Sequence, residues 1–247
     1  MELFVLFMYA LIGLIGGFAA GLFGIGGGAI KVPLLAMTGM PLINAFAVNM
    51  FAIPFSSATG AFFQRKNIDY KAAKPFIIGA VLAIALATFF VGIVSSSVLA
   101  VLFFLAAVIT VIGLYIEQLN GRFYKILKPT TKNLFLGGFI TNIIIGLRGG
   151  SGGSLFAPVL KALHLEMHHA VATSLFVSIF SAITALLIYL FRGDILFIPA
   201  IIVGLGSTIG SFLGSHLSLK TTDKWLKLGL ALVVFLLALN VLFREFM

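Results

Sequence analysis

The sequence predicts an all-α membrane protein with about eight transmembrane helices arranged as two four-helix repeats. Three observations support this fold class. Hydrophobic residues make up 61% of the chain and charged residues only 9%, whereas a soluble domain carries roughly 25% charged residues. Apolar runs of about 20 residues, the length that crosses the hydrocarbon core of a bilayer, recur along the chain. Near-copies of one glycine cluster break two apolar stretches half a chain apart.

The apolar runs give the expected elements in order. Spans are expected at residues 3–23, 42–64, 72–94, 97–116, 133–148, 168–191, 195–214 and 225–244. Two further segments, 29–38 and 154–163, are too short to cross alone and are expected to form half-helices after the glycine breaks. The chain thus divides into a first membrane repeat at 1–120, a basic cytoplasmic hinge at 121–132 and a second membrane repeat at 133–247.

The duplication is clearest around the two glycine breaks. The chain reads G-I-G-G-G-A-I-K-V-P-L-L at 24–35 and G-G-S-G-G-S-L-F-A-P-V-L at 149–160, so Pro33 matches Pro158 under a shift of 125 residues (158 − 33). Non-helical backbone at membrane depth is tolerated only where protein or water covers it, so we expect both breaks to line an internal cavity. An even number of spans per repeat makes the repeats parallel and an odd effective number inverts them; the sequence leaves both open.

The basic residues predict the orientation. With eight crossings, one side carries Arg65, Lys66, Lys71, Lys74, Arg122, Lys125, Lys128, Lys132, Arg192 and Arg244, and the other chiefly Lys161, Lys220, Lys224 and Lys227. The side richer in basic residues is expected to be cytoplasmic, which places both termini inside, at the cytoplasmic (inner) membrane. The net charge of +9 is attributed to loops facing anionic lipid. Nucleic-acid binding is not expected, because the basic residues are not interleaved with aromatic ones.

The glycine clusters predict an anion site. Consecutive small residues before a helix leave backbone N–H groups pointing at an open concavity, with the positive end of the helix dipole behind them. Ser151 and Ser154 add hydroxyl donors, and Ser154 is also a candidate cap for the helix that follows. The alternative is that glycines only let helices pack closely. That interpretation fits the glycines that recur every four residues, namely Gly13, Gly17 and Gly21, and Gly206, Gly210 and Gly214.

Two cations flank the breaks without matching each other. Under the shift of 125 residues, Lys31 matches Phe156 and Arg148 matches Phe23. Ionisable residues inside a membrane are costly and are functional candidates by default, although a long side chain near a helix end also reaches the interface easily. We favour an anion ligand for Arg148, because a guanidinium binds oxyanions bidentately; for Lys31 both interpretations stay open.

Four buried-span polar residues are candidates to complete the site: Asn49, Asn142, Thr173 and Ser174. Asn49 and Ser174 occupy matched repeat positions, which favours a shared role, while for each residue alone a hydrogen bond between helices is the alternative. All seven acidic residues fall at termini or in expected loops, so the cavity should be net positive. The segment around His164, His168 and His169 has no second ligand set, and no metal site is expected. Catalytic and nucleotide-binding motifs are absent from the sequence, so neither an enzyme nor a cofactor is expected.

With these motifs in view, the chain resembles the sulfite exporter TauE/SafE family of membrane permeases. The resemblance rests on G-L-F-G-I-G-G-G at 21–28 with Pro33, on G-G-S-G-G-S at 149–154 with Pro158, on the segments 45–49 and 170–174, and on the short loops Asn67-Ile-Asp69 and Arg192-Gly-Asp194. It implies movement of sulfite, sulfonates or related sulfur oxyanions across the cytoplasmic membrane.

The sequence and the resemblance together give one hypothesis. We expect a secondary transporter that exports a small sulfur-containing anion by alternating access, with a passive anion channel as the alternative; a membrane enzyme and a carrier of cations or neutral solutes find less support. The expected partners are the anion, membrane lipid and a second copy of the chain docked through the Gly206/Gly210/Gly214 face. The expected substrate-binding residues are Gly26, Gly27, Gly28, Lys31, Asn49, Arg148, Gly150, Ser151, Gly152, Gly153, Ser154 and Ser174.

Overall fold

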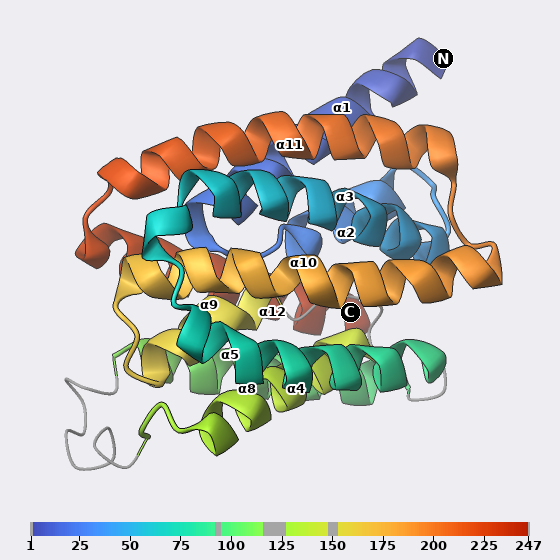
Figure 1. Ribbon diagram of the computed structural model, residues 1–247. Coiled ribbons are helices and arrows are strands. Elements are labelled where there is room, and N and C mark those ends of the chain that lie inside the picture. The colour runs from blue at the N-terminus through green and yellow to red at the C-terminus, as the bar shows by residue number, and fades with distance from the viewer. Residues whose placement is uncertain (1, 92–94, 116–126, 148–152, 247) are drawn as a thin grey trace.

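The structure is a computed structural model that describes residues 2–91, 95–115, 127–147 and 153–246. In these ranges the regular structure is helical (Figure 1). The α-helices are α1 (Glu2–Phe23), α2 (Gly28–Met37), α3 (Leu42–Phe63), α4 (Tyr70–Phe89), α5 (Ser96–Leu114), α8 (Thr131–Gly146), α9 (Gly153–Ala162), α10 (Met167–Arg192), α11 (Phe197–Lys220) and α12 (Asp223–Phe246). A short 3₁₀ turn, η1 (Arg65–Asn67), links α3 to α4.

Each expected span coincides with one long helix, and the two expected half-helices are α2 and α9. The all-helical prediction is therefore confirmed for the described residues. Five helices, α1, α3, α4, α10 and α11, are long and apolar enough to cross a membrane. The count of eight spans is not confirmed. Local chemistry sets several boundaries: the Asp69 side chain accepts from the backbone N–H groups of Lys71 and Ala72 at the start of α4, and Gly193 ends α10 in the left-handed conformation.

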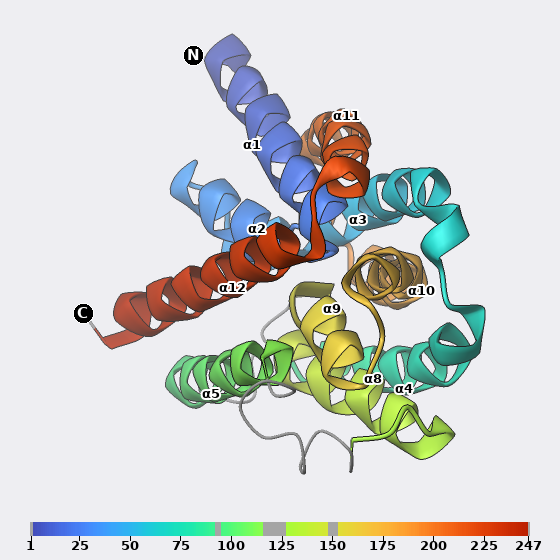
Figure 2. The same cartoon turned by 90° about the vertical axis from the view of Figure 1, so that its left-hand side faces the viewer.

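The long helices form two bundles of three parallel helices each. In the first bundle, α1 runs beside α11 in the same direction, because Gly13 packs on Val203 and Gly21 on Ser211. The third member is α3, whose Ser56 carbonyl accepts a hydrogen bond from the Ser211 hydroxyl of α11. The second bundle joins α4, α8 and α10. Figure 2, which looks along α10 and α11, shows α10 between the α1/α3/α11 group and the α4/α8/α9 group.

Within the second bundle the direction is again shared. Gly138 of α8 packs on Phe76, and Gly146 packs on Ala87, so α4 and α8 are parallel. Each bundle therefore combines helices from both halves of the sequence. In the first bundle α1 packs on α11, and in the second bundle α8 packs on α4. The predicted division at 1–120 and 133–247 stays a prediction; most of its hinge, 121–132, lies outside the described residues.

The two bundles are inverted with respect to each other. The bundles meet along α3 and α10, which are antiparallel: the Asn44 side chain near the start of α3 donates to the Asp194 carbonyl just after α10, and Gly60 near the end of α3 packs on Leu175 near the start of α10. Helices α1, α3 and α11 of one bundle thus correspond to α8, α10 and α4 of the other, with reversed direction (Figure 1). The cause is the half-helix, which returns the chain within the protein and makes the effective number of crossings per repeat odd.

The glycines spaced by four residues pack the first bundle, as the sequence predicts. Gly206, Gly210 and Gly214 of α11 lie directly against the backbone of α1 at Ala10, Leu14 and Phe18. A Cβ at any of them would overlap that backbone. The expectation that this face docks a second copy is therefore wrong, because α1 of the same chain covers it. The homodimer itself stays a prediction, without an assigned face.

Two glycines of α11 provide a matched test of this packing. We expect Gly206→Ala to lower thermal stability by about 1–3 kcal/mol, the usual cost of overpacking, because the added methyl meets the Ala10 carbonyl. Gly204→Ala should be neutral or stabilising by about 0.5–1 kcal/mol, because its Cβ would stand 3.8 Å from the Phe51 ring. Thermal unfolding of the purified variants in one detergent measures both. Equal effects of the two substitutions would contradict the helix contact.

The two ends of the bundles differ in charge. At one end α3 and α11 finish and α4, α8, α10 and α12 begin (Figure 1). This end, called the basic end below, carries the described residues Arg65, Lys66, Lys71, Lys74, Lys128, Lys132, Lys161, Lys220, Lys224 and Lys227. Arg192 lies at the opposite end, paired with Asp194 at 2.9 Å. The expected grouping of Arg192 with Arg65, and of Lys220 on the other side, is wrong because the half-helices add reversals that the eight-span count omits.

Candidate functional site

The first glycine break is a tight loop that only glycine adopts easily. Gly24, Gly26 and Gly27 have φ values of +72°, +67° and +71°, in the left-handed region that a Cβ disfavours. Gly27 is the residue that precedes α2, and its carbonyl accepts the Lys31 N–H at 2.9 Å. The break therefore turns the chain back from α1 and starts a ten-residue helix inside the protein.

The first break and the start of α9 come together at mid-depth. A Cβ placed on Gly153, the first residue of α9, would lie 3.2 Å from the Gly26 Cα and 3.0 Å from the Ser178 hydroxyl. Ser178 is in the middle of α10, so this meeting point is halfway between the helix ends. From it, α2 runs towards the start of α3 and α9 runs towards the start of α10, at opposite ends of the molecule (Figure 1). The N-termini of both half-helices, the positive ends of their dipoles, thus face one shared region.

Each half-helix start faces a buried polar side chain that has no partner among the described residues. A Cβ on Gly28, the first residue of α2, would stand 2.7 Å from the Asn49 Nδ2. Asn49 is 0% exposed, and neither its Nδ2 nor its Oδ1 makes a hydrogen bond. The Ser178 hydroxyl beside Gly153 is likewise buried and unpartnered. Since an unsatisfied buried polar group costs about 1–3 kcal/mol, these two groups indicate a place where a ligand completes the hydrogen bonding.

Lys31 is a buried cation next to the same loop. It is 0% exposed, and its Nζ makes no hydrogen bond or ion pair among the described residues. Its side chain fits because Gly16 of α1 has no Cβ; an added one would overlap the Lys31 methylenes. The side chain also runs close to Gly27, whose Cβ would stand 3.1 Å from the Lys31 Cε. The structure therefore favours a role inside the protein over an ammonium that reaches the membrane interface.

Ser174 holds the first break in place. Its hydroxyl lies 2.8 Å from the Gly24 carbonyl and 2.8 Å from the Val171 carbonyl of its own helix. It thus ties α10 of the second repeat to the loop of the first repeat. This hydrogen bond is the alternative that the sequence left open for Ser174, and the residue's role as a ligand of the substrate stays a prediction.

Some of the remaining predicted residues lie outside the described residues, and the others lie in helices. Four of them, Arg148, Gly150, Ser151 and Gly152, lie outside the described residues. Ser154 is buried near the start of α9, and its roles as a cap and as a ligand stay predictions. Asn142 and Thr173 make bonds between helices: the Asn142 amide donates to the Ala80 carbonyl, and the Thr173 hydroxyl accepts from the Asp69 N–H.

The sequence reasoning missed Ser178. Its matched position in the first repeat is Ile53, so the duplication gives no signal there. A signal did exist in the helix period, because Ser178 lies four residues after Ser174 and shares its face. The same face continues to Ser181 and Tyr189, whose hydroxyls are also buried and unpartnered. A row of unpaired hydroxyls therefore leads from the breaks towards the end of α10.

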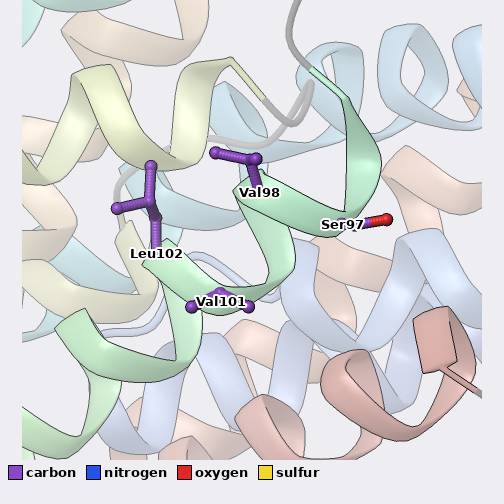
Figure 3. A pocket seen from close by; sticks show the side chains of 4 residues that line it. All are labelled: Ser97, Val98, Val101 and Leu102. Carbon is purple, nitrogen blue, oxygen red and sulfur yellow. The ribbon is translucent and has the colours of Figure 1, made fainter.

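Two hollows on the described surface do not suit an anion. One of about 310 Å³ lies beside the first turns of α5 and is lined by Ser97, Val98, Val101 and Leu102 (Figure 3). A second, of about 320 Å³, lies between the outer faces of α1 and α11 and is lined by apolar side chains such as Leu14 and Leu205. The lining residue Leu205 is 63% exposed. Apolar hollows on an apolar exterior fit lipid chains.

The histidines lie at the basic end, away from the breaks. The His168 Nε2 is 3.3 Å from an Asp223 carboxylate oxygen, which links the start of α10 to the start of α12. In the ranges that the structure covers, no three histidine, aspartate or glutamate side chains come together as metal ligands would.

A comparison with known families identifies the chain's relatives. The profile described as "Sulfite exporter TauE/SafE" matches residues 9–241. The chain belongs to the TauE/SafE family. Among its relatives, the chain is similar to a "Probable membrane transporter protein" of Haemophilus influenzae, with 26% identity over 95% of this chain and 97% of that protein.

Two further TauE/SafE relatives agree. They are the "Probable membrane transporter protein YunE" of Bacillus subtilis, with 24% identity over 94% of this chain and 96% of the relative, and the "Probable membrane transporter protein ORF9" of a Sinorhizobium species, with 28% identity over 88% and 85%. No solved structure matches the chain. The TauE/SafE membership and the apolar helices together make this chain a multi-pass membrane transporter.

Proposed function

We propose that this protein is a secondary transporter that exports a small sulfur-containing anion, such as sulfite or a sulfonate, by alternating access. The observation that carries the proposal is the meeting of two half-helix N-termini at mid-depth, where Gly26 lies against Gly153. Broken helices whose N-termini face each other near the midplane are typical of anionic-substrate sites in transporters with inverted repeats.

The chemistry of the site supports an anion. Two helix dipoles present their positive ends, and Asn49 and Ser178 offer an unpaired amide and hydroxyl as donors. Lys31 adds a potential positive charge beside the α2 start. The described carboxylates of Asp69, Glu166, Asp194 and Asp223 stand at helix ends or in connections, so none of them faces the breaks. Sulfite and sulfonate oxygens accept several hydrogen bonds at once, and the name of the family points to the same chemistry.

The inverted bundles support alternating access. The α1/α3/α11 bundle and the α4/α8/α10 bundle have matching but opposed architectures, and they meet along α3 and α10 beside the site. Rocking of one bundle against the other opens the site first to one face of the membrane and then to the other. Because α11 and α4 exchange between repeats, the moving bodies are these mixed bundles and not the two halves of the sequence.

The basic end also supports an orientation. If the positive-inside rule is applied to the observed ends, the basic end faces the cytoplasm. Helix α1 begins and α12 ends at the opposite end of the molecule (Figure 1). Both termini are then outside, the reverse of the sequence expectation. A C-terminal alkaline phosphatase fusion should be active and a green fluorescent protein fusion dark; the opposite pair of results would refute this orientation.

A flux assay tests the function. Purified protein in liposomes should release preloaded radiolabelled sulfite at a rate that saturates with concentration, and release should fall when an unlabelled substrate competes. A passive anion channel shares the same residues, but its flux rises without saturating and is far faster. Arg148→Ala is expected to abolish release; wild-type flux in that variant would remove Arg148 from the site.

A further inference from the structure

The charge on Lys31 carries an inference about coupling that rests on the proposed anion site. In the described structure, the Lys31 Nζ is enclosed with no acceptor and no counter-ion. An ammonium loses its hydration on burial, and without a partner the neutral amine is the favoured form. Lys31 also sits in the first turn of α2, where the positive end of the dipole repels a cation. Burial without a partner and the position at the start of α2 thus both disfavour a charged Lys31.

An anion between the half-helices reverses this balance. A negative charge at the starts of α2 and α9 would lie beside the first turn that carries Lys31, and an opposite charge at short range favours the protonated amine. We propose that Lys31 is the proton-binding group of the anion site: it is neutral when the site is empty and takes up one proton when the anion binds. Because linkage is reciprocal, the proton strengthens anion binding by the same factor.

Among the described residues, no other titratable group near α2 takes this role. Of the helices packed against α2, α3 has no titratable residue. Helix α1 carries Glu2 and Tyr9, which lie about 21 Å and about 10 Å along the helix axis from Gly16. Helix α9 carries Lys161 in its last turn, at the basic end. Tyr189 of α10 shares an apolar cluster with Leu35 of α2 and lies in the half of α10 beyond Ser178.

Proton uptake changes the charge that crosses the membrane. The amine nitrogen gains one proton on the loading side and releases it, with the anion, on the other side, so the proton balance closes in each cycle. A monovalent sulfonate then moves without net charge, whereas a dianion such as fully ionised sulfite moves as one negative charge. A membrane potential that is negative inside therefore drives the dianion outwards but does not act on the monovalent sulfonate. The potential thus favours export of dianions, which sharpens the substrate class.

Calorimetry tests the proton uptake directly. The probe is methanesulfonate, whose own charge does not change near neutral pH, added to the purified full chain in two buffers of different ionisation enthalpy. The difference in binding heat gives the protons taken up per anion. Wild type should take up close to one. Lys31→Arg, which keeps a permanent charge, should bind the anion with an uptake close to zero, and Lys161→Met, a matched lysine of the other half-helix, should behave as wild type.

The outcomes separate this inference from the proposed function. Binding by wild type without proton uptake, or undiminished uptake by Lys31→Arg, overturns the assignment of Lys31. If the heat of binding is too small to measure, a parallel liposome assay uses radiolabelled methanesulfonate and an internal pH dye. Anion flux with no proton flux overturns the coupling but leaves the proposed transport function standing. Absence of flux for both methanesulfonate and sulfite refutes the proposed function, and the coupling with it.

Discussion

Gly153→Val is expected to abolish anion flux while the protein remains folded. Gly153 is the contact between the two breaks, and a Cβ there already approaches the Gly26 Cα at 3.2 Å and the Ser178 hydroxyl at 3.0 Å. Because Gly26 and Ser178 already approach that Cβ closely, the two γ-methyls of valine would force the half-helix starts apart at the place where the anion is proposed to bind. Flux in liposomes measures the loss, and size-exclusion chromatography with thermal unfolding measures the fold.

A graded series controls this experiment. Gly153→Ala adds only the Cβ, which requires its neighbours to move by a few tenths of an ångström, so partial flux is expected. Gly204→Ala on α11 introduces the same atom at a position with ordinary contacts and should keep full flux. If Gly153→Val transports at the wild-type rate, the space between the breaks is not the path of the anion.

Asn49→Leu is expected to reduce flux about tenfold to 150-fold. This range corresponds to the loss of one hydrogen bond to a charged group, which contributes about 1.5–3 kcal/mol. The same change should leave stability unchanged or higher, because leucine keeps the branched arrangement of the side-chain heavy atoms and removes two buried polar atoms that lack partners among the described residues. Flux per reconstituted protein and thermal unfolding in detergent measure the two effects separately.

The second buried asparagine is the matched control. Asn142 is equally buried, but its amide donates to the Ala80 carbonyl at 2.8 Å and joins α8 to α4. Asn142→Leu should therefore lower stability, by about 1–3 kcal/mol. A stable, inactive Asn49→Leu beside a destabilised Asn142→Leu is the expected pair. Loss of stability in Asn49→Leu with flux intact would show that Asn49 supports packing instead.

The helices were predictable because the preference of each apolar side chain for the membrane depends on that residue alone, so a run of such residues is visible in the sequence. Runs of apolar residues predict α1 and α3 without knowledge of their neighbours, and the glycine clusters before Pro33 and Pro158 predict the half-helices. Which helix packs on which was not predictable. The exchange of α4 and α11 between bundles depends on three-dimensional contacts, such as Gly79 on Phe135, that no shift of the sequence reveals.

The candidate site shows the same limit. A shift of 125 residues pairs Asn49 with Ser174, yet the residue that faces α9 as Asn49 faces α2 is Ser178. The shift compares backbone positions, whereas a ligand contact depends on the reach and direction of a side chain, and the two repeats have diverged in both. Counting crossings failed for a related reason: a half-helix reverses the chain without being long enough to register as a span.

The absence of cysteine from the chain allows the most direct test of the site. Ser178→Cys places one thiol at the junction of the two half-helices, where it replaces an unpaired hydroxyl. In membranes, a sulfonate-bearing methanethiosulfonate should modify this thiol faster than a trimethylammonium-bearing one of similar size, and methanesulfonate, which does not react with either reagent, should slow the reaction. Faster modification by the cationic reagent, or a rate that methanesulfonate does not change, would contradict the claim that the converging helix starts hold an anion.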